Sequence, residues 1–128
     1  MNRLRIVLVD HDESVRGLLR TTFSGENHEI LEATNGDDGL RLIEEQSPDV
    51  VILDWQTPGR HGSLVLDAVK TRRRTLPVIV LTADQRPSQR ELAESIGADA
   101  FLNKPFSPVE LLSVIERLLA ERPRDDLA

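Results

Sequence analysis

Residues 50–54 read Val-Val-Ile-Leu-Asp, an uninterrupted apolar run that stops at a carboxylate, and this pattern decides the fold. Two similar runs, at residues 6–9 and 78–81, are also followed directly by a polar side chain. These runs are short, rich in β-branched residues and apolar at both alternating positions, which is typical of parallel strands covered on both faces. Weaker runs at residues 29–33 and 100–102 indicate edge strands. The sequence therefore predicts a sheet of five strands.

Amphipathic helical patterns follow each of these runs. Apolar side chains at helical spacing mark five segments, at residues 15–23, 40–43, 65–69, 92–96 and 111–119. Asp12 and Ser14 are candidate caps for the first helix. Gly97 is expected to end the fourth helix and Pro108 to begin the fifth. Strict alternation of strands and helices implies right-handed crossovers, so the sequence predicts an α/β fold with a parallel sheet.

Length and composition favour a single domain. The chain has 128 residues, and we expect one domain over residues 1–122 with residues 123–128 as a disordered tail or the start of a linker. A hydrophobic share of 39% is enough for an ordinary core. The net charge of −6 argues against direct binding to nucleic acid or membrane, since both are anionic. Cysteine is absent, which excludes disulfides and thiolate metal sites. No segment resembles a signal peptide or membrane span, so we expect a cytoplasmic protein.

Polar side chains follow four of the expected strands. Asp10 follows the first, Asp54 ends the third, Thr82 follows the fourth, and Lys104 comes shortly after the fifth. Ligands of open α/β sheets bind outside the carboxyl ends of the strands, so these side chains are expected to converge. Converging carboxylates repel, and a hard divalent cation, above all Mg²⁺, would neutralise them. A cation, an ammonium and a hydroxyl are also what a transferring phosphoryl group requires, and a carboxylate can be its nucleophile.

Four blocks of the sequence resemble the signature blocks of response-regulator receiver domains of bacterial two-component systems. The blocks are residues 8–16, 52–59, 80–83 and 97–106. The resemblance extends over about residues 4 to 120, with the blocks in the family's order and spacing. It implies a flavodoxin-like doubly wound (βα)5 fold with strand order 2-1-3-4-5. It also implies a phosphorylation-dependent signalling switch, a regulatory domain rather than an enzyme.

The resemblance assigns a role to each polar residue at the strand ends. Asp54 would accept a phosphoryl group from a sensor histidine kinase or a phosphotransfer protein. Asp10, the carboxylate of Asp54 and the backbone carbonyl of Gln56 would hold Mg²⁺. Lys104 would pair with the phosphoryl oxygens, and its peptide bond to Pro105 would be cis.

Four residues would act in switching and in loss of the phosphoryl group. Thr82 would hydrogen-bond the phosphoryl group and move towards it, and Phe101 would turn inward as Thr82 moves. The surface of the fourth helix, the fifth strand and the fifth helix would change as a result. Gln56 and Asp84 would tune how fast water removes the phosphoryl group. Simple packing of an edge strand is the alternative for Phe101.

His11 is the one substantial departure from the family pattern. The family usually has two adjacent acids here, the second a direct metal ligand, and this chain has His11 as the second. An imidazole suits Zn²⁺ or Mn²⁺ better than Mg²⁺, so we expect weaker Mg²⁺ binding or a shift towards Mn²⁺. Either His11 or Asp12 could complete the ligand set, or His11 could turn out to solvent.

Other functions remain open from the residues alone. One alternative is a receiver-like interaction module that is not phosphorylated. Another is a phosphatase similar to the haloacid dehalogenases, with Asp10 as nucleophile and Asp12 as general acid, although the block at residues 54–59 would then be unexplained. A flavin mononucleotide binder would need a loop rich in Ser, Thr and Gly after the first strand, and this loop is acidic.

The partners implied are a kinase or phosphotransfer protein and a downstream protein target or output domain. The chain would be either a stand-alone regulator or a receiver cut from a longer protein near Pro123. Solvated charge or a phosphorylation-dependent homodimer could each account for the end of the fifth helix. The residues concerned are Arg117, Leu118, Leu119, Arg122 and Arg124.

Overall fold

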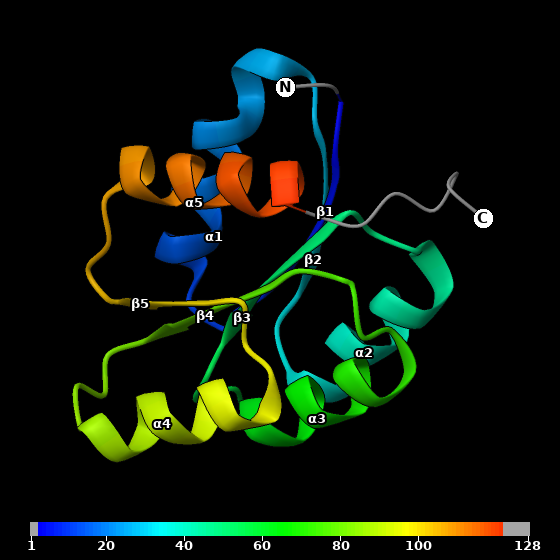
Figure 1. Cartoon of the computed structure of the whole chain (residues 1–128). Helices are drawn as coiled ribbons and strands as arrows, with labels where there is room; N and C mark the ends of the chain where they lie inside the picture. The colour runs from blue at the N-terminus through cyan, green and yellow to red at the C-terminus, as the bar shows by residue number, and fades with distance from the viewer. Residues whose placement is uncertain (1–2, 122–128) are drawn as a thin grey trace.

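Five parallel strands form one sheet with helices on both faces, as seen in a computed structural model that describes residues 3–121, apart from the side chain of Glu26 (Figure 1). The strands are β1 (Arg5–Val9), β2 (Glu29–Ala33), β3 (Val50–Asp54), β4 (Val78–Thr82) and β5 (Ala100–Asn103). The helices are α1 (Glu13–Phe23), α2 (Gly36–Gln46), α3 (Gly62–Arg72), α4 (Pro87–Ile96) and α5 (Pro108–Glu121), and a 3-10 turn, η1 (Ser24–Glu26), follows α1. The expected tail at 123–128 lies outside the described residues.

The strand order is β2-β1-β3-β4-β5, so the doubly wound fold and the 2-1-3-4-5 order are confirmed. Helices α1 and α5 cover one face of the sheet, and α2, α3 and α4 cover the other (Figure 1). Within the described part of the chain, no helix has the length and apolar character needed to span a bilayer.

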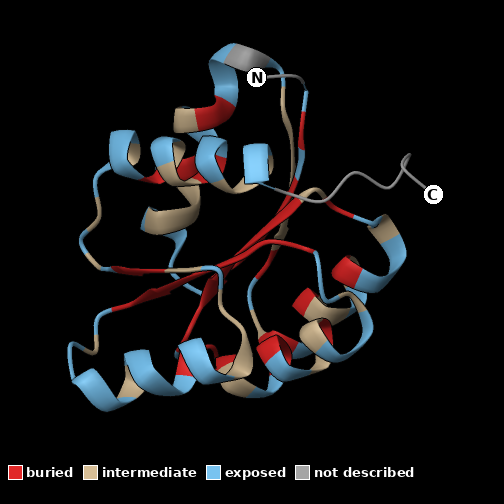
Figure 2. Cartoon of the chain, viewed as in Figure 1, coloured by how far each residue is buried: buried red, intermediate tan, exposed pale blue. Residues whose placement is uncertain are grey.

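Strand β3 explains why the sheet is a double-sided core. Successive side chains of a strand point to opposite faces, and every residue of β3 is buried. Val51 and Leu53 pack in the cluster under α2, α3 and α4, whereas Val50 and Ile52 pack in the cluster under α1 and α5. Figure 2 shows the buried residues concentrated along the sheet and on the inner faces of the helices. The apolar runs of the sequence are therefore the centre of both cores.

Two glycines hold the loop after β3 against its neighbours. A Cβ atom on Gly36 would lie 2.1 Å from the backbone oxygen of Arg60, and one on Gly62 would lie 2.6 Å from that of Trp55. The amide of Gly36 also donates to the carbonyl of Pro58 at 3.2 Å. The absence of side chains at both glycines lets α2 and α3 approach this loop closely, which fixes the chain that follows Asp54.

Candidate functional site

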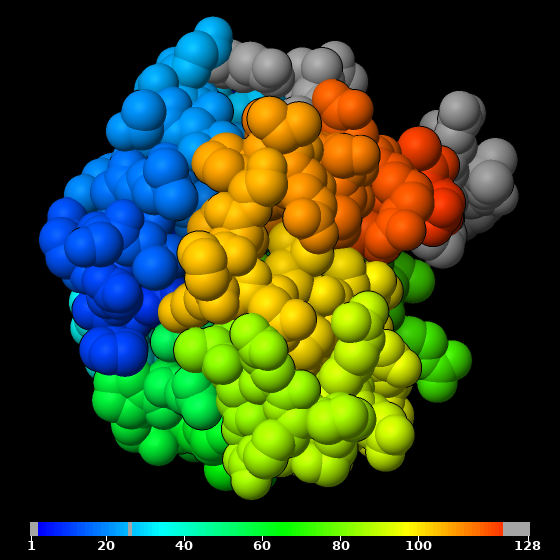
Figure 3. All heavy atoms as spheres, turned by 90° about the vertical axis from the view of Figure 1, so that its left-hand side faces the viewer, coloured from blue at the N-terminus to red at the C-terminus, as the bar shows by residue number. Residues whose placement is uncertain are grey.

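The polar residues expected at the strand ends do meet at one edge of the sheet. Figure 3 looks onto that edge, where the segments after β1 (dark blue), β3 (green), β4 (yellow-green) and β5 (orange) share one face. Lys104 comes from the segment after β5, and its amide donates to the carbonyl of Thr82 at 2.7 Å. This bond joins the last residue of β4 to the lysine.

Two buried carboxylates and one ammonium form the centre of the site. The Nζ of Lys104 lies 2.8 Å from Oδ2 of Asp10 and 3.4 Å from Oδ1 of Asp54. Asp10 is fully buried and Asp54 is 2% exposed, although they come from different strands. One lysine therefore faces two acids, and the pair of carboxylates has more negative charge than Lys104 can balance.

The excess of negative charge affects the pKa values of Asp54 and Lys104. Burial and then the charge of Asp10 raise the pKa of Asp54, and Lys104 offsets this only in part. Burial disfavours the charge on Lys104, but its hydrogen bond to Asp10 and the charge of Asp54 outweigh burial, so the pKa of Lys104 is raised. Lys104 thus stays charged, while ionised Asp54 is in an unfavourable electrostatic environment that a further cation would relieve.

Backbone amides hold the polar groups in place. Oδ1 of Asp10 accepts from the amide of Asp12 at 2.9 Å, and Oδ1 of Asp54 accepts from the amide of Gln56 at 3.3 Å. The hydroxyl of Thr82 is fully buried and accepts from the amide of Asp84 at 3.0 Å. Each group is therefore positioned by the loop that directly follows its own strand.

The donor set fits a divalent cation. Asp10, His11 and Asp54 each offer a ligand atom, and these atoms lie within 4.8 Å of one another, the only such group among the residues that the structure describes. Two carboxylates supply the oxygen ligands that Mg²⁺ and Mn²⁺ accept. The chemistry of the residues is therefore suited to the metal that the family resemblance implies. The role of the Gln56 carbonyl stays a prediction.

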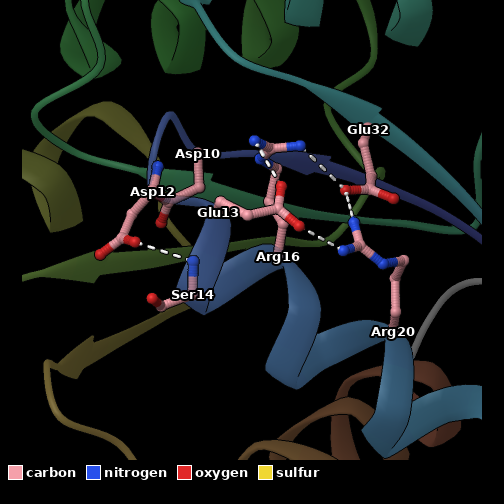
Figure 4. Close-up of polar contacts among 7 residues, drawn as sticks. All are labelled: Asp10, Asp12, Glu13, Ser14, Arg16, Arg20 and Glu32. Atoms are coloured by element: carbon pink, nitrogen blue, oxygen red, sulfur yellow. Dashed lines mark hydrogen bonds and ion pairs between the residues drawn. The ribbon is translucent and has the colours of Figure 1, made fainter.

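Asp12 is directed elsewhere. Its Oδ1 accepts from the amide of Ser14 at 2.9 Å, which makes Asp12 the N-cap of α1 (Figure 4). Loss of such a cap typically costs about 1 kcal/mol, so turning the side chain towards Asp54 would cost about that amount. Of the two candidates for the remaining ligand, the structure brings His11 and not Asp12 into the group.

Phe101 and Asp84, two of the residues with an expected role in the switch, each lie beside an arginine. Phe101 is 8% exposed and packs into the core, and the guanidinium of Arg90 lies 5.6 Å from the centre of its ring. The ring is therefore already buried in this structure. Asp84 forms an ion pair with Arg86, and this hydrogen bonding lowers the pKa of Asp84. The peptide bond between Lys104 and Pro105 is cis.

Four contacts were not evident from the sequence. Arg90 covers Phe101, and Trp55 is buried and donates through its indole nitrogen to Oε1 of Gln89 at 2.8 Å. His61 caps α3 through Nδ1 and lies edge-on to Trp55. Gln89 and Arg90 belong to α4, which comes far along the chain, so only the tertiary fold brings them to these rings.

The chain matches the family described as "Response regulator receiver domain" over residues 6–116. It is 35% identical over 125 residues to "Response regulator MprA" of Mycobacterium leprae, a match that covers 98% of this chain and 55% of the relative. A response regulator of the same name from Mycolicibacterium vanbaalenii is 37% identical, with 96% of this chain and 53% of the relative covered. The chain thus spans about half the length of these curated relatives.

Solved structures agree with these sequence matches. The receiver domain of the Francisella response regulator 1452 superposes with a TM-score of 0.86 at 26% identity, covering 93% of this chain and 98% of that one. A structure described as a putative response regulator from Chloroflexus aurantiacus gives a TM-score of 0.86 at 30% identity, with 93% and 99% covered. Sequence, fold and the acidic pocket therefore agree, and the chain belongs to the receiver domains of two-component response regulators, a regulatory rather than a catalytic family.

Proposed function

We propose that this domain is a phosphorylation-dependent switch in which Asp54 accepts a phosphoryl group from a sensor histidine kinase or a phosphotransfer protein. The observation that carries the proposal is the placement of Lys104 between two buried carboxylates at the end of the sheet. Asp10 and Asp54, joined by the backbone carbonyl of Gln56, would hold the divalent cation. Such a cation, when bound, compensates charge on the phosphoryl oxygens.

The residues of the chain divide the transfer step between them. A carboxylate oxygen of Asp54 forms a bond to phosphorus as the nitrogen–phosphorus bond of the donor phosphohistidine breaks, and the electron pair stays on the imidazole. Lys104, whose raised pKa keeps it protonated, faces the oxygens that gain charge. Thr82 ends the neighbouring strand and would donate its hydroxyl proton to the new phosphoryl group.

The signal would leave through the surface of α4, β5 and α5. A groove of about 640 Å³ lies on this surface, and Arg90, Phe101 and Val114 are among the residues that line it. Movement of Thr82 and Phe101 would change this groove and thereby a downstream partner, an output domain or a second copy of the chain. Gln56 and Asp84 would set the lifetime of the phosphoryl group, and the cytoplasmic location remains a prediction from the sequence.

Incubation with acetyl phosphate and Mg²⁺ or Mn²⁺, followed by intact mass measurement, tests the proposal. The wild-type chain is expected to gain one phosphoryl group and Asp54→Asn none. The matched control is Asp67→Asn, which removes an exposed acid on α3 and is expected to behave as wild type.

Two outcomes would contradict the proposal. Uptake that survives Asp54→Asn but is lost in Asp10→Ala would favour the phosphatase alternative. A wild-type chain that gains no phosphoryl group with either metal would favour an interaction module that works without phosphorylation.

A further inference from the structure

The two oxygens of Asp54 face different neighbours. Oδ1 lies 3.4 Å from the ammonium of Lys104, whereas Oδ2 lies 3.6 Å from Nδ1 of His11. The side chain of Asp54 is 3% exposed and that of His11 is 58% exposed, so the imidazole lies on the solvent side of the buried carboxylate. A cation that enters from solvent and reaches Oδ2 would therefore meet the ring nitrogen of His11.

The spacing suits ligands of one small ion. Donors about 2.1 Å from an octahedral ion lie about 3 Å apart when adjacent and about 4.2 Å apart when opposite. The separation of 3.6 Å between Nδ1 of His11 and Oδ2 of Asp54 falls between these values, and the ligand atoms of the whole group lie within 4.8 Å of one another. The contact between His11 and Asp54 therefore already has a separation that one small ion could bridge.

The neighbouring acids have other partners. Asp12 caps α1 through Ser14, and Glu13 forms ion pairs with Arg16 and Arg20 (Figure 4). An acidic ligand drawn from either position would break one of these arrangements. Among the residues directly after Asp10, His11 is the one that the structure directs towards Asp54.

We propose that Nδ1 of His11 is a ligand of the divalent cation and that the pocket consequently favours Mn²⁺ over Mg²⁺. Mg²⁺ prefers oxygen ligands. Imidazole nitrogen suits first-row transition metals better, and the affinity of mixed nitrogen and oxygen sites for these metals rises along a series that begins with Mn²⁺. A site with two carboxylates and one imidazole should therefore bind Mn²⁺ more tightly than Mg²⁺. This inference rests on the proposed function, since it names the metal of the same site.

Pulsed electron paramagnetic resonance of the Mn²⁺-loaded protein tests the nitrogen ligand directly. Wild type is expected to show coupling of Mn²⁺ to a ligand nitrogen, and His11→Asn is expected to lose it. The matched control is His61→Asn, which removes another exposed histidine and retains a side chain that can cap α3. Its nitrogen coupling should equal that of wild type. Absence of the coupling in wild type, or its survival in His11→Asn, would overturn the inference.

Competition between Mn²⁺ and Mg²⁺ measures the preference. His11→Asn offers a neutral oxygen, so it changes the ligand type without adding charge, whereas His11→Asp changes both. The ratio of Mn²⁺ to Mg²⁺ affinity is expected to fall about tenfold or more in both variants, the lower end of what loss of metal-site interactions produces. An unchanged ratio in His11→Asn would contradict the preference.

Phosphoryl uptake by the same samples separates this inference from the proposed function. Uptake at Asp54 without nitrogen coupling would leave the switch intact and remove His11 from the metal. Nitrogen coupling without uptake at Asp54 would leave the metal ligand intact and contradict the switch.

Discussion

Two lysine–carboxylate pairs lie at opposite ends of the parallel strands and resemble each other in geometry. Lys70 is 2.6 Å from Asp99 at the edge where the strands begin, and Lys104 is 2.8 Å from Asp10 at the edge where they end. Asp99 also accepts from the amide of Val78 at 2.8 Å, and Lys70 also donates to a backbone carbonyl. One acid is thus matched by one lysine.

The pair of Lys104 and Asp10, where the strands end, has a third member. Asp54 shares Lys104 with Asp10, and both acids are almost fully buried, whereas the side chain of Asp99 is 33% exposed. A lysine–carboxylate contact is therefore structural where its charges balance and available for ligand binding where they do not.

Replacing either lysine by methionine should separate function from structure. Lys104→Met is expected to slow phosphoryl uptake from acetyl phosphate by about 100-fold or more, the effect of removing one group that stabilises developing charge. Lys70→Met should leave the rate within about twofold of wild type, because Lys70 is at the far edge of the sheet. Time courses of intact mass give both rates. Equal slowing in the two variants would contradict the distinction.

A divalent cation should stabilise the fold only by binding at the carboxyl ends of the strands, where Asp10 and Asp54 share one lysine. At 100 times the dissociation constant, Mn²⁺ is expected to raise the free energy of unfolding of wild type by about 2.7 kcal/mol. Asp54→Asn should lose most of this increase, because it removes a ligand carboxylate, and Asp99→Asn should retain it. Urea unfolding with and without Mn²⁺ measures the effect, and a matching loss in Asp99→Asn would place the cation elsewhere.

Lys70→Met and Lys104→Met should also differ in whether Mn²⁺ restores their stability. Lys70→Met is expected to lower the free energy of unfolding by about 1–3 kcal/mol, because Asp99 is left without its cation. Lys104→Met should lose a similar amount, since two acids then face each other. Mn²⁺ should restore much of the stability of Lys104→Met and none of that of Lys70→Met. The readout is the shift in urea midpoint, and equal recovery would count against the comparison.

The pH dependence of stability should carry the smallest effect. The pKa of Asp54 is raised above its unfolded value of 3.8, so the folded state binds this proton more tightly than the unfolded chain does. Ionised Asp54 therefore lowers stability above its folded pKa, and the loss disappears as pH falls through that pKa towards 3.8. Asp54→Asn without metal should therefore be more stable than wild type at neutral pH, because it lacks this unfavourable charge.

Thermal unfolding of Asp54→Asn and wild type across this pH range measures the gain. It should shrink as the pH falls. A gain that grows towards acidic pH would mean that the pKa of Asp54 is lowered rather than raised.

The sheet could be predicted because its runs are apolar on both faces. The expected strand at residues 50–53 is observed as Val50–Asp54, and residues 29–33 form the edge strand β2. The start of α2 could not be predicted, because Gly36 and Gly39 are poor helix formers. They occur there for packing, since a Cβ on Gly39 would lie 2.6 Å from Val9. Local propensity cannot reveal such a contact.

Part of the candidate site could likewise be predicted from the sequence, and part of it could not. Asp10, Asp54 and Lys104 could be predicted to converge, because strand ends of a parallel sheet meet at one edge. The choice between His11 and Asp12 could not, because the sequence offered both Asp12 and Ser14 as caps, and Asp12 is held by the helix only if it is the residue that caps α1. It required the directions of side chains, which residue spacing alone does not determine.

The contact between Trp55 and Gln89 affects the fluorescence of the protein. Trp55 is the single tryptophan of the chain, it directly follows Asp54, and its indole is buried with its nitrogen bonded to α4. Indole emission shifts to longer wavelength when water replaces such an environment. The intrinsic fluorescence of the unlabelled domain therefore reports whether α4 remains attached to the end of β3.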